Sequence, residues 1–264
     1  MEYRDKLFDK VDRLPIESVP RTLMLIGEYG CGKKTLIDYM CEKYNLEMED
    51  ISDKLSLEYI EEITLRVHPK IYVIDCTKLT IKNENVILKF LEEPLKNSFI
   101  ILTCEHKESV IPTVLNRCQQ WRFQSYPDEY LREYANLLGC DSDLLLSVAN
   151  TPGKILTYRE YPISDMMGLA NKMFSSMSSA NFANALTIER FVAFKGEKDK
   201  FDFDLFTNIL LLVSKHNCIN NTPRCFESYE LVRSLCNNKV VFNIDKKALF
   251  NKFLIDLKLL MSGG

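Results

Sequence analysis

The stretch Gly27-Glu28-Tyr29-Gly30-Cys31-Gly32-Lys33-Lys34-Thr35 decides the fold of this chain. It follows an apolar run at residues 23–26, which predicts a buried strand, and it precedes residues 36–44, whose apolar spacing predicts a helix. A strand, a glycine loop, a lysine and a helix together form the context of a phosphate-binding P-loop. The glycines let backbone N–H groups turn toward a phosphate, and the helix N-terminus adds partial positive charge.

The loop fits the P-loop pattern everywhere except at its magnesium position. The pattern places Ser or Thr after the lysine, where the hydroxyl holds Mg²⁺, but Lys34 stands there. Thr35 comes one residue later and points about 100° away around a helix. The alternative is a plain glycine turn before a core helix. The candidate nucleotide-binding residues of the loop are Gly27, Gly30, Gly32, Lys33, Lys34 and Thr35.

Two further apolar runs predict buried strands with polar ends. Residues 71–74 lead into Asp75, which is the Walker B pattern: the acid can hold a water of Mg²⁺ opposite the phosphates. Active ATPases usually follow that acid with Glu, which polarises the attacking water, but here Cys76 follows, and a thiol is mostly uncharged at neutral pH. Residues 99–103 end in Thr103, a further candidate nucleotide-binding residue. A plain core strand with a terminal Asp is the alternative for residues 71–75.

The composition limits the class of protein. A chain of 264 residues suits one large domain or two to three small ones, and 46% apolar residues allow a sizeable core. The net charge of −3 argues against a generally basic protein that coats nucleic acid, though not against a local basic face. The nine cysteines are scattered and form no C-x-x-C pair, so we expect reduced thiols in a cytoplasmic protein. No apolar run approaches the roughly 20 residues of a membrane span, and we expect no membrane contact.

Five segments resemble the AAA+ subunits of DNA polymerase clamp loaders. They are residues 72–75, 78–80, 88–94, 99–103 and 111–119, within a resemblance that covers roughly residues 20–125. Its most specific parts are Leu91-Glu92-Glu93-Pro94 and Asn116-Arg117-Cys118. In that family the Arg of Ser-Arg-Cys is an arginine finger, which acts on ATP held by the neighbouring subunit. The resemblance implies this catalytic role, in trans, for Arg117; Asn116 replaces the Ser but leaves the Arg in place. The alternative is that Arg117 is a surface residue at the end of a short helix or the partner of an internal salt bridge.

The resemblance also implies the division into domains. We expect an α/β P-loop AAA+ domain with a parallel sheet at residues 1–125, a helical lid at residues 126–165 and an all-α bundle at residues 166–264. Helical periodicity supports the last region, whereas only the resemblance makes that bundle the collar of an oligomeric ring.

Two other features of the family are altered. Hydrolysing relatives carry a sensor Arg in the lid, and Gly153 occupies its place here; the adjacent Lys154 could substitute only partly. Bacterial relatives carry a four-cysteine zinc module, but Cys41 is the only cysteine between Cys31 and Cys76. We therefore expect no zinc and no other metal site.

Lys34, Cys76 and Gly153 all depart from the hydrolysing pattern, so the resemblance implies a delta-prime-like, non-hydrolysing subunit of a DNA polymerase III clamp loader. Such a subunit supports ATP-dependent loading of the sliding clamp on DNA. Binding of ATP or ADP by this chain is expected to be weak or absent. The implied partners are other clamp-loader subunits, through the C-terminal bundle and the Arg117 face, and the sliding clamp and primer-template DNA through the complex. The alternatives are an ATP-hydrolysing motor subunit and a stand-alone nucleotide-binding AAA+ protein.

Overall fold

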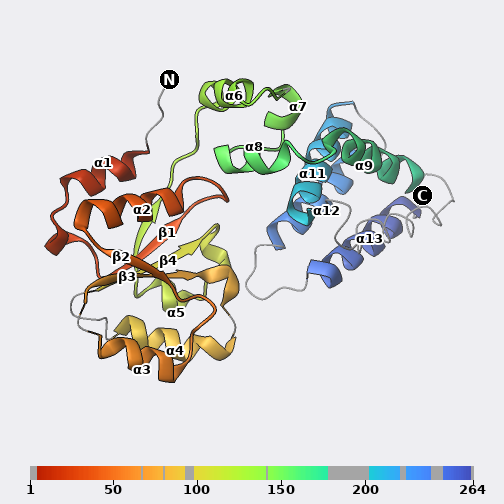
Figure 1. Cartoon of the computed structure of the whole chain (residues 1–264). Coiled ribbons are helices and arrows are strands. Elements are labelled where there is room, and N and C mark those ends of the chain that lie inside the picture. Colours follow the sequence, from red (N-terminus) through yellow and green to blue (C-terminus); the bar gives the residue numbers. More distant parts are fainter. Residues whose placement is uncertain are drawn as a thin grey trace. The chain divides into compact units, whose positions relative to one another are not determined.

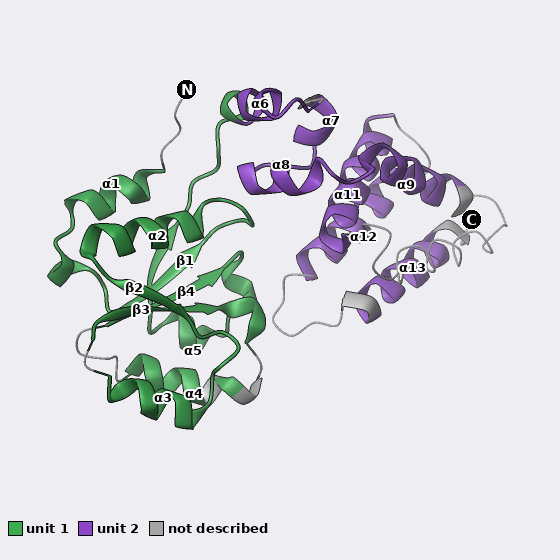
Figure 2. Cartoon of the chain, in the orientation of Figure 1, with its two compact units in different colours: residues 1–130 green, residues 131–264 purple. Residues whose placement is uncertain are grey.

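The chain forms two compact units, residues 1–130 and residues 131–264 (Figure 2). The structure is a computed structural model, and it describes residues 5–66, 68–79, 81–92, 98–140, 142–177, 202–220, 224–238 and 246–262. Unit 1 is an α/β unit and the described part of unit 2 is helical (Figure 1). The predicted fold class, a parallel α/β P-loop unit followed by helices, is confirmed. The predicted boundaries at residues 125 and 165 stay predictions.

Unit 1 is built on a five-stranded parallel sheet with the order β2-β3-β4-β1-β5. The central strand β1 therefore pairs with β4 on one side and with β5 on the other. The edge strand β2 lies in the acidic segment at residues 46–51, whose sequence lacks the apolar alternation of a buried strand. The strands are β1 (Thr22–Ile26), β2 (Glu47–Asp50), β3 (Lys70–Asp75), β4 (Phe99–Cys104) and β5 (Gln119–Arg122).

Helices cover both faces of this sheet (Figure 1). The helix after the P-loop begins at Lys33, three residues earlier than its apolar spacing predicted. Ser56 caps the next helix, because its hydroxyl accepts a hydrogen bond from the N–H of Tyr59 at 3.2 Å. The helices of unit 1 are α1 (Lys6–Arg13), α2 (Lys33–Tyr44), α3 (Leu57–Thr64), α4 (Ile81–Glu92) and α5 (Pro112–Leu115), with 3₁₀ turns at Ile16–Ser18, Cys76–Lys78 and Lys107–Ser109.

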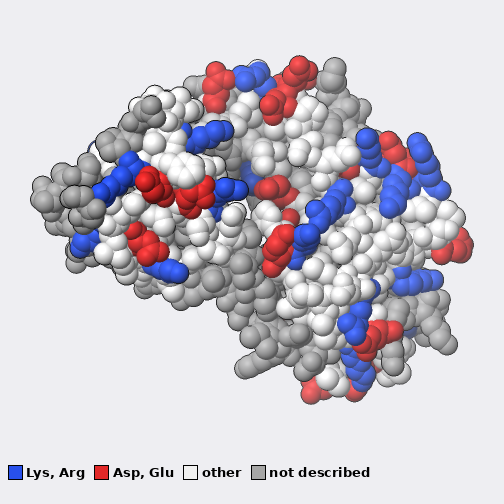
Figure 3. All heavy atoms as spheres, turned by 180° about the vertical axis from the view of Figure 1, so that it is seen from behind, with Lys and Arg blue, Asp and Glu red and all other residues white. Residues whose placement is uncertain are grey.

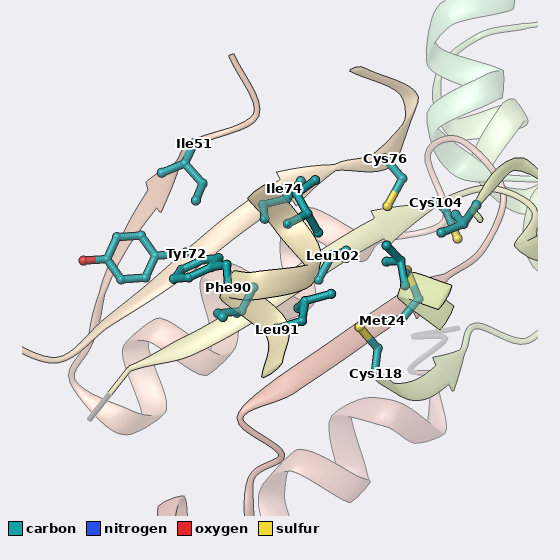
Figure 4. Close-up of a cluster of buried hydrophobic side chains, with 14 of the residues drawn as sticks. Met24, Ile51, Tyr72, Ile74, Cys76, Phe90, Leu91, Leu102, Cys104 and Cys118 are labelled. Atoms are coloured by element: carbon teal, nitrogen blue, oxygen red, sulfur yellow. The ribbon is translucent and has the colours of Figure 1, made fainter. Parts of the chain in front are cut away.

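Alternate residues of β1, β3 and β4 separate into two apolar clusters. Leu23 and Leu25 of β1 pack in the cluster that contains Leu36 of α2. Met24 and Ile26 pack in the cluster that contains Phe90 of α4, part of which is drawn in Figure 4. Successive strand residues point to opposite faces. A parallel sheet covered by helices on both sides therefore needs the near-continuous apolar runs that the sequence shows.

The described part of unit 2 consists of helices that pack on one another. Helix α11 contacts α9 and α12, and α12 contacts α13. Phe206, Ile209 and Leu210 of α11 are fully buried. The sequence also predicts a helix at residues 181–194, which lies outside the described residues. The helices are α6 (Asp128–Leu137), α7 (Ser142–Leu146), α8 (Pro152–Tyr158), α9 (Ile163–Met177), α11 (Phe203–Ile219), α12 (Cys225–Asn238) and α13 (Lys246–Ser262); α6 begins in unit 1. Among the described residues, none of these helices combines the length and apolar character that crossing a membrane needs.

A buried carboxylate, Asp5, joins the start of α1 to the segment that follows β5. One of its oxygens accepts a hydrogen bond from the N–H of Leu7, which caps α1, and the other accepts one from the N–H of Gln124, both at 2.9 Å. These contacts hold α1 and the segment after β5 beside each other in unit 1.

Replacing Asp5 with Ala should lower the free energy of unfolding of unit 1 by about 1–3 kcal/mol, because one helix cap and one long-range hydrogen bond are lost together. Urea unfolding followed by circular dichroism measures this. Asp38→Ala, at an exposed position of α2, is the control and should stay within about 0.5 kcal/mol of the unchanged protein. Equal effects of the two substitutions would contradict the assigned role of Asp5.

Candidate nucleotide and arginine site

The glycine loop runs from the end of β1 to the start of α2 and is tightly packed. A Cβ atom at position 27 would lie 2.6 Å from Sγ of Cys31 and 2.9 Å from Cβ of Phe123, so only glycine fits there. Gly32 immediately precedes α2 with a φ of 101°, in the region that favours glycine. The glycines thus serve the close turn that a P-loop requires.

The side chain of Lys33 is folded back on this loop. Its Nζ donates to the carbonyl oxygens of Gly27 and, at 3.0 Å, of Glu28. Tyr126 donates its hydroxyl hydrogen to the carbonyl of Cys31 at 3.0 Å, so an aromatic residue from the segment after β5 is also bonded to the loop. The Lys33 amine and the carbonyl oxygens of the loop are therefore hydrogen-bond partners within unit 1.

The first turn of α2 does not offer a Mg²⁺ ligand at the usual position. Lys34 and Thr35 are both exposed. Lys34 places a cation at this position, and two unit charges 4 Å apart at an effective dielectric near 20 repel by about 4 kcal/mol as an upper estimate. Weak or absent binding of Mg²⁺-nucleotide stays a prediction.

Asp75 and Thr103 lie side by side at the same edge of the sheet as the loop. The strand register pairs Asp75 of β3 with Thr103 of β4, and Thr103 with Leu25 of β1. The Asp75 carboxylate, however, accepts hydrogen bonds from the N–H of Thr77 at 2.9 Å and from its hydroxyl at 2.8 Å. One carboxylate oxygen is therefore engaged in capping the 3₁₀ turn that follows β3.

Cys76 belongs to the apolar core rather than to a hydrolytic centre. It lies in the cluster of Cys104 and Cys118 (Figure 4), and it is 3% exposed. Burial raises the pKa of the Cys76 thiol well above its ordinary value, and burial also raises the pKa of Cys104 to about 11 and that of Cys118 to about 12. These thiols are neutral at pH 7, so Cys76 offers no charged group that could polarise a water.

Arg117 lies at the opposite edge of the sheet from the loop. The hydroxyl of Thr22, the first residue of β1, donates to the carbonyl of Arg117 at 2.7 Å, whereas the loop follows the last residue of β1. A strand rises about 3.3 Å per residue, so the two ends of β1 are about 13 Å apart. The Arg117 side chain is 34% exposed and forms an ion pair with Glu92.

In unit 2, Lys154 is buried and its amine donates to the side-chain oxygen of Asn150 at 3.0 Å. Gly153 and Lys154 both lie in the first turn of α8, which Thr151 caps. Among the described residues, no group of three His, Cys, Asp or Glu side chains is placed to hold a metal ion. The absence of zinc stays a prediction.

The structure therefore brings most candidate residues to the edge of the sheet formed by the C-terminal ends of the strands, and Arg117 to the edge formed by their N-terminal ends. The loop, Asp75 and Thr103 share the C-terminal edge. Sequence reasoning missed Phe123 and Tyr126, which contact the loop. Their position directly after β5, whose end is paired with the end of β1, is the signal that could have pointed to them.

Sequence comparison associates the middle of the chain with one family. Residues 42–127 match the family described as "DNA polymerase III, delta subunit". The DNA polymerase III subunit delta′ of Bacillus subtilis is 35% identical over 68 residues, which are 25% of this chain and 21% of that protein. The delta′ subunit of Haemophilus influenzae is 37% identical over 59 residues, 22% of this chain and 18% of that protein. The matched part thus spans about a fifth of the length of these curated relatives.

Structural comparison finds more distant likenesses. The crystal structure of a DNA polymerase III gamma subunit-related protein from Thermotoga maritima has a TM-score of 0.46 and 15% identity, and covers 97% of this chain and 98% of that one. The Bacillus subtilis DNA clamp loader delta protein has a TM-score of 0.39 and 9% identity, with 96% and 98% covered. These likenesses are too distant to assign a role to any residue.

Cys76→Glu should destabilise unit 1 by about 3 kcal/mol or more at pH 7 without creating ATPase activity, because a carboxyl group that is ionised in the unfolded state must be buried in an apolar cluster. The loss should be larger at pH 8 than at pH 5. The buried carboxyl must stay protonated in the folded state, whereas the unfolded state releases that proton above a pKa of about 4.3. Cys76→Ala is the control, and urea unfolding at both pH values measures the difference. A Glu variant as stable as the Ala variant would contradict burial of this side chain.

Lys34→Thr should tighten binding of Mg²⁺-ATP at least about tenfold, since removing even 1.4 kcal/mol of repulsion changes Kd that much. Lys34→Gln removes the charge without supplying a hydroxyl ligand, so it should give only part of the gain. Titration calorimetry of both variants with and without Mg²⁺ separates the two effects. Unchanged affinity in both variants would show that position 34 does not limit binding.

Proposed function

Because residues 42–127 match the DNA polymerase III delta-subunit family, we propose that this chain is a delta-prime-like, non-hydrolysing subunit of a DNA polymerase III clamp loader. In this role it supports ATP-dependent loading of the sliding clamp on DNA during replication. The observation that carries the proposal is the family match itself, which includes Asp75, Thr103 and Arg117.

The placement of Arg117 supports action on a neighbouring subunit. Arg117 lies at the N-terminal end of β1 and its own P-loop at the C-terminal end, so the length of that strand separates it from any phosphate bound in the loop. It is partly exposed, and guanidinium is permanently charged and forked, which suits the charge that develops on a transferred phosphoryl group. We propose that Arg117 is an arginine finger that acts in trans.

Three local features support the absence of hydrolysis by this chain. Lys34 opposes Mg²⁺, Cys76 is a buried neutral thiol, and the Asp75 carboxylate caps the following turn. ATP or ADP would then bind weakly or not at all at the loop. No zinc or other metal is part of the proposal.

The proposed partners are the other clamp-loader subunits. Ile255 and Leu259 lie one turn apart on α13 and are 57% and 66% exposed, which supports the C-terminal helices as one contact surface. The second proposed contact surface is the edge of the sheet that carries Arg117. Basic and acidic side chains are interspersed on the face that Figure 3 shows, and the chain is acidic overall. We propose that sliding clamp and primer-template DNA are engaged through the complex rather than by this chain alone.

Arg117→Ala should leave folding and complex assembly intact and lower ATP turnover by the neighbouring subunit. Fingers of this kind contribute about 10³–10⁵ in rate in the best-studied phosphoryl-transfer systems. Turnover and clamp loading are measured in the complex reconstituted with the partner subunits. Melting temperature and mass of the assembly are measured in parallel.

Arg66→Ala is a matched control, because Arg66 is 31% exposed and paired with Glu49 and Glu62 in the same unit. It should leave turnover unchanged. Unchanged turnover in a fully assembled Arg117→Ala complex would remove Arg117 from the site. A lower melting temperature with normal turnover would make Arg117 a structural residue only.

A further inference from the structure

The backbone at Arg117 is held in place by hydrogen bonds and by its buried neighbours. Its N–H donates to the carbonyl of Val114 at 3.1 Å, and its own carbonyl accepts from Thr22 at 2.7 Å. Val114 is fully buried, and Cys118 on the other side belongs to the same apolar cluster. The backbone is therefore fixed, and only the side-chain torsions remain to set where the guanidinium points.

Glu92 and the carbonyl of Thr113 set those torsions. Nε of Arg117 donates to Oε1 of Glu92 at 3.0 Å, Nη2 donates to the same oxygen, and Nη1 donates to the Thr113 carbonyl at 2.9 Å. Glu92 is the last residue of α4, and the preceding Phe90 and Leu91 are 1% and 4% exposed. The acceptor is thus carried by an anchored helix end, 25 residues before the arginine in the sequence.

These contacts leave the outer part of the guanidinium able to bind an anion. A guanidinium has five N–H groups, and the contacts with described residues use three of them, one on each nitrogen. Within the described part of the chain, one N–H on each terminal nitrogen has no hydrogen-bond acceptor. A pair of parallel N–H groups is the arrangement that binds two phosphate oxygens.

We propose that Glu92 is the positioning residue of the finger: it orients the Arg117 guanidinium so that its remaining N–H groups are presented to a phosphate held by a neighbouring subunit. The inference rests on the proposed function. Preorientation of this kind matters because a reacting group that is misplaced by about 1 Å can cost on the order of 10²-fold in rate.

The exposure of the pair supports a role in orientation rather than in stability. The side chains of Arg117 and Glu92 are 34% and 53% exposed, and exposed ion pairs contribute little to folding. Replacing Glu92 should therefore leave the fold unchanged, which makes the substitution a clean test of the inference.

The test compares Glu92→Ala, Glu92→Gln, Arg117→Ala and the Glu92→Ala/Arg117→Ala double variant in the reconstituted complex. Glu92→Ala should lower kcat of the neighbouring subunit about tenfold with an unchanged KM, a smaller loss than the removal of the finger itself. Glu92→Gln keeps an oxygen acceptor and should recover part of the rate. The double variant should be no slower than Arg117→Ala alone, because Glu92 acts only through the arginine.

Glu62→Ala is the matched control, since Glu62 is an exposed glutamate paired with an arginine elsewhere in unit 1. It should leave kcat and KM unchanged. A normal or raised kcat in Glu92→Ala, or a further loss in the double variant, would overturn the role of Glu92 while leaving the proposed function intact. Unchanged turnover in Arg117→Ala would overturn both the role of Glu92 and the finger role of Arg117.

Discussion

The pairing of β1 with β4 on one side and β5 on the other fixes where every candidate residue of unit 1 lies. The C-terminal end of β1 leads into the glycine loop. At its N-terminal end, the hydroxyl of Thr22 donates a hydrogen bond to the carbonyl of Arg117. Because all five strands are parallel, polar residues that end different strands must meet at the same edge. The sheet therefore separates the edge that carries the glycine loop from the edge that carries Arg117 by the length of one strand.

Burial on both faces of the sheet explains how the residues of the P-loop and Walker B patterns can be altered without loss of the fold. The alternation of side chains places Met24 and Ile26 in one core cluster and Leu23 and Leu25 in the other. Cys76 joins the first of these clusters as a small neutral side chain. The apolar positions that hold the sheet together are thus distinct from the polar positions that would bind Mg²⁺, so the second set can change while the first is kept.

The glycine loop has structural contacts of its own. Lys33 and Tyr126 bond to loop carbonyls, and Gly27 packs against Phe123. The carboxylate of Asp5 accepts a hydrogen bond from the N–H of Gln124, which lies between Phe123 and Tyr126 in the sequence. The loop, α1 and the segment after β5 are therefore held together by contacts that require no nucleotide.

The sequence by itself determined the strand and helix pattern of unit 1, the glycine loop, the Walker B acid and the altered Lys34 and Cys76, because these are local patterns with fixed periods and spacings. It left the edge strand β2 undecided, because its acidic residues lack the apolar alternation of a buried strand. Only the tertiary structure decided that Arg117 lies opposite its own loop, that Tyr126 bonds to that loop and that Glu92 holds the guanidinium. Each of these contacts joins residues 25 or more apart, and such contacts depend on strand order and helix packing rather than on any local pattern.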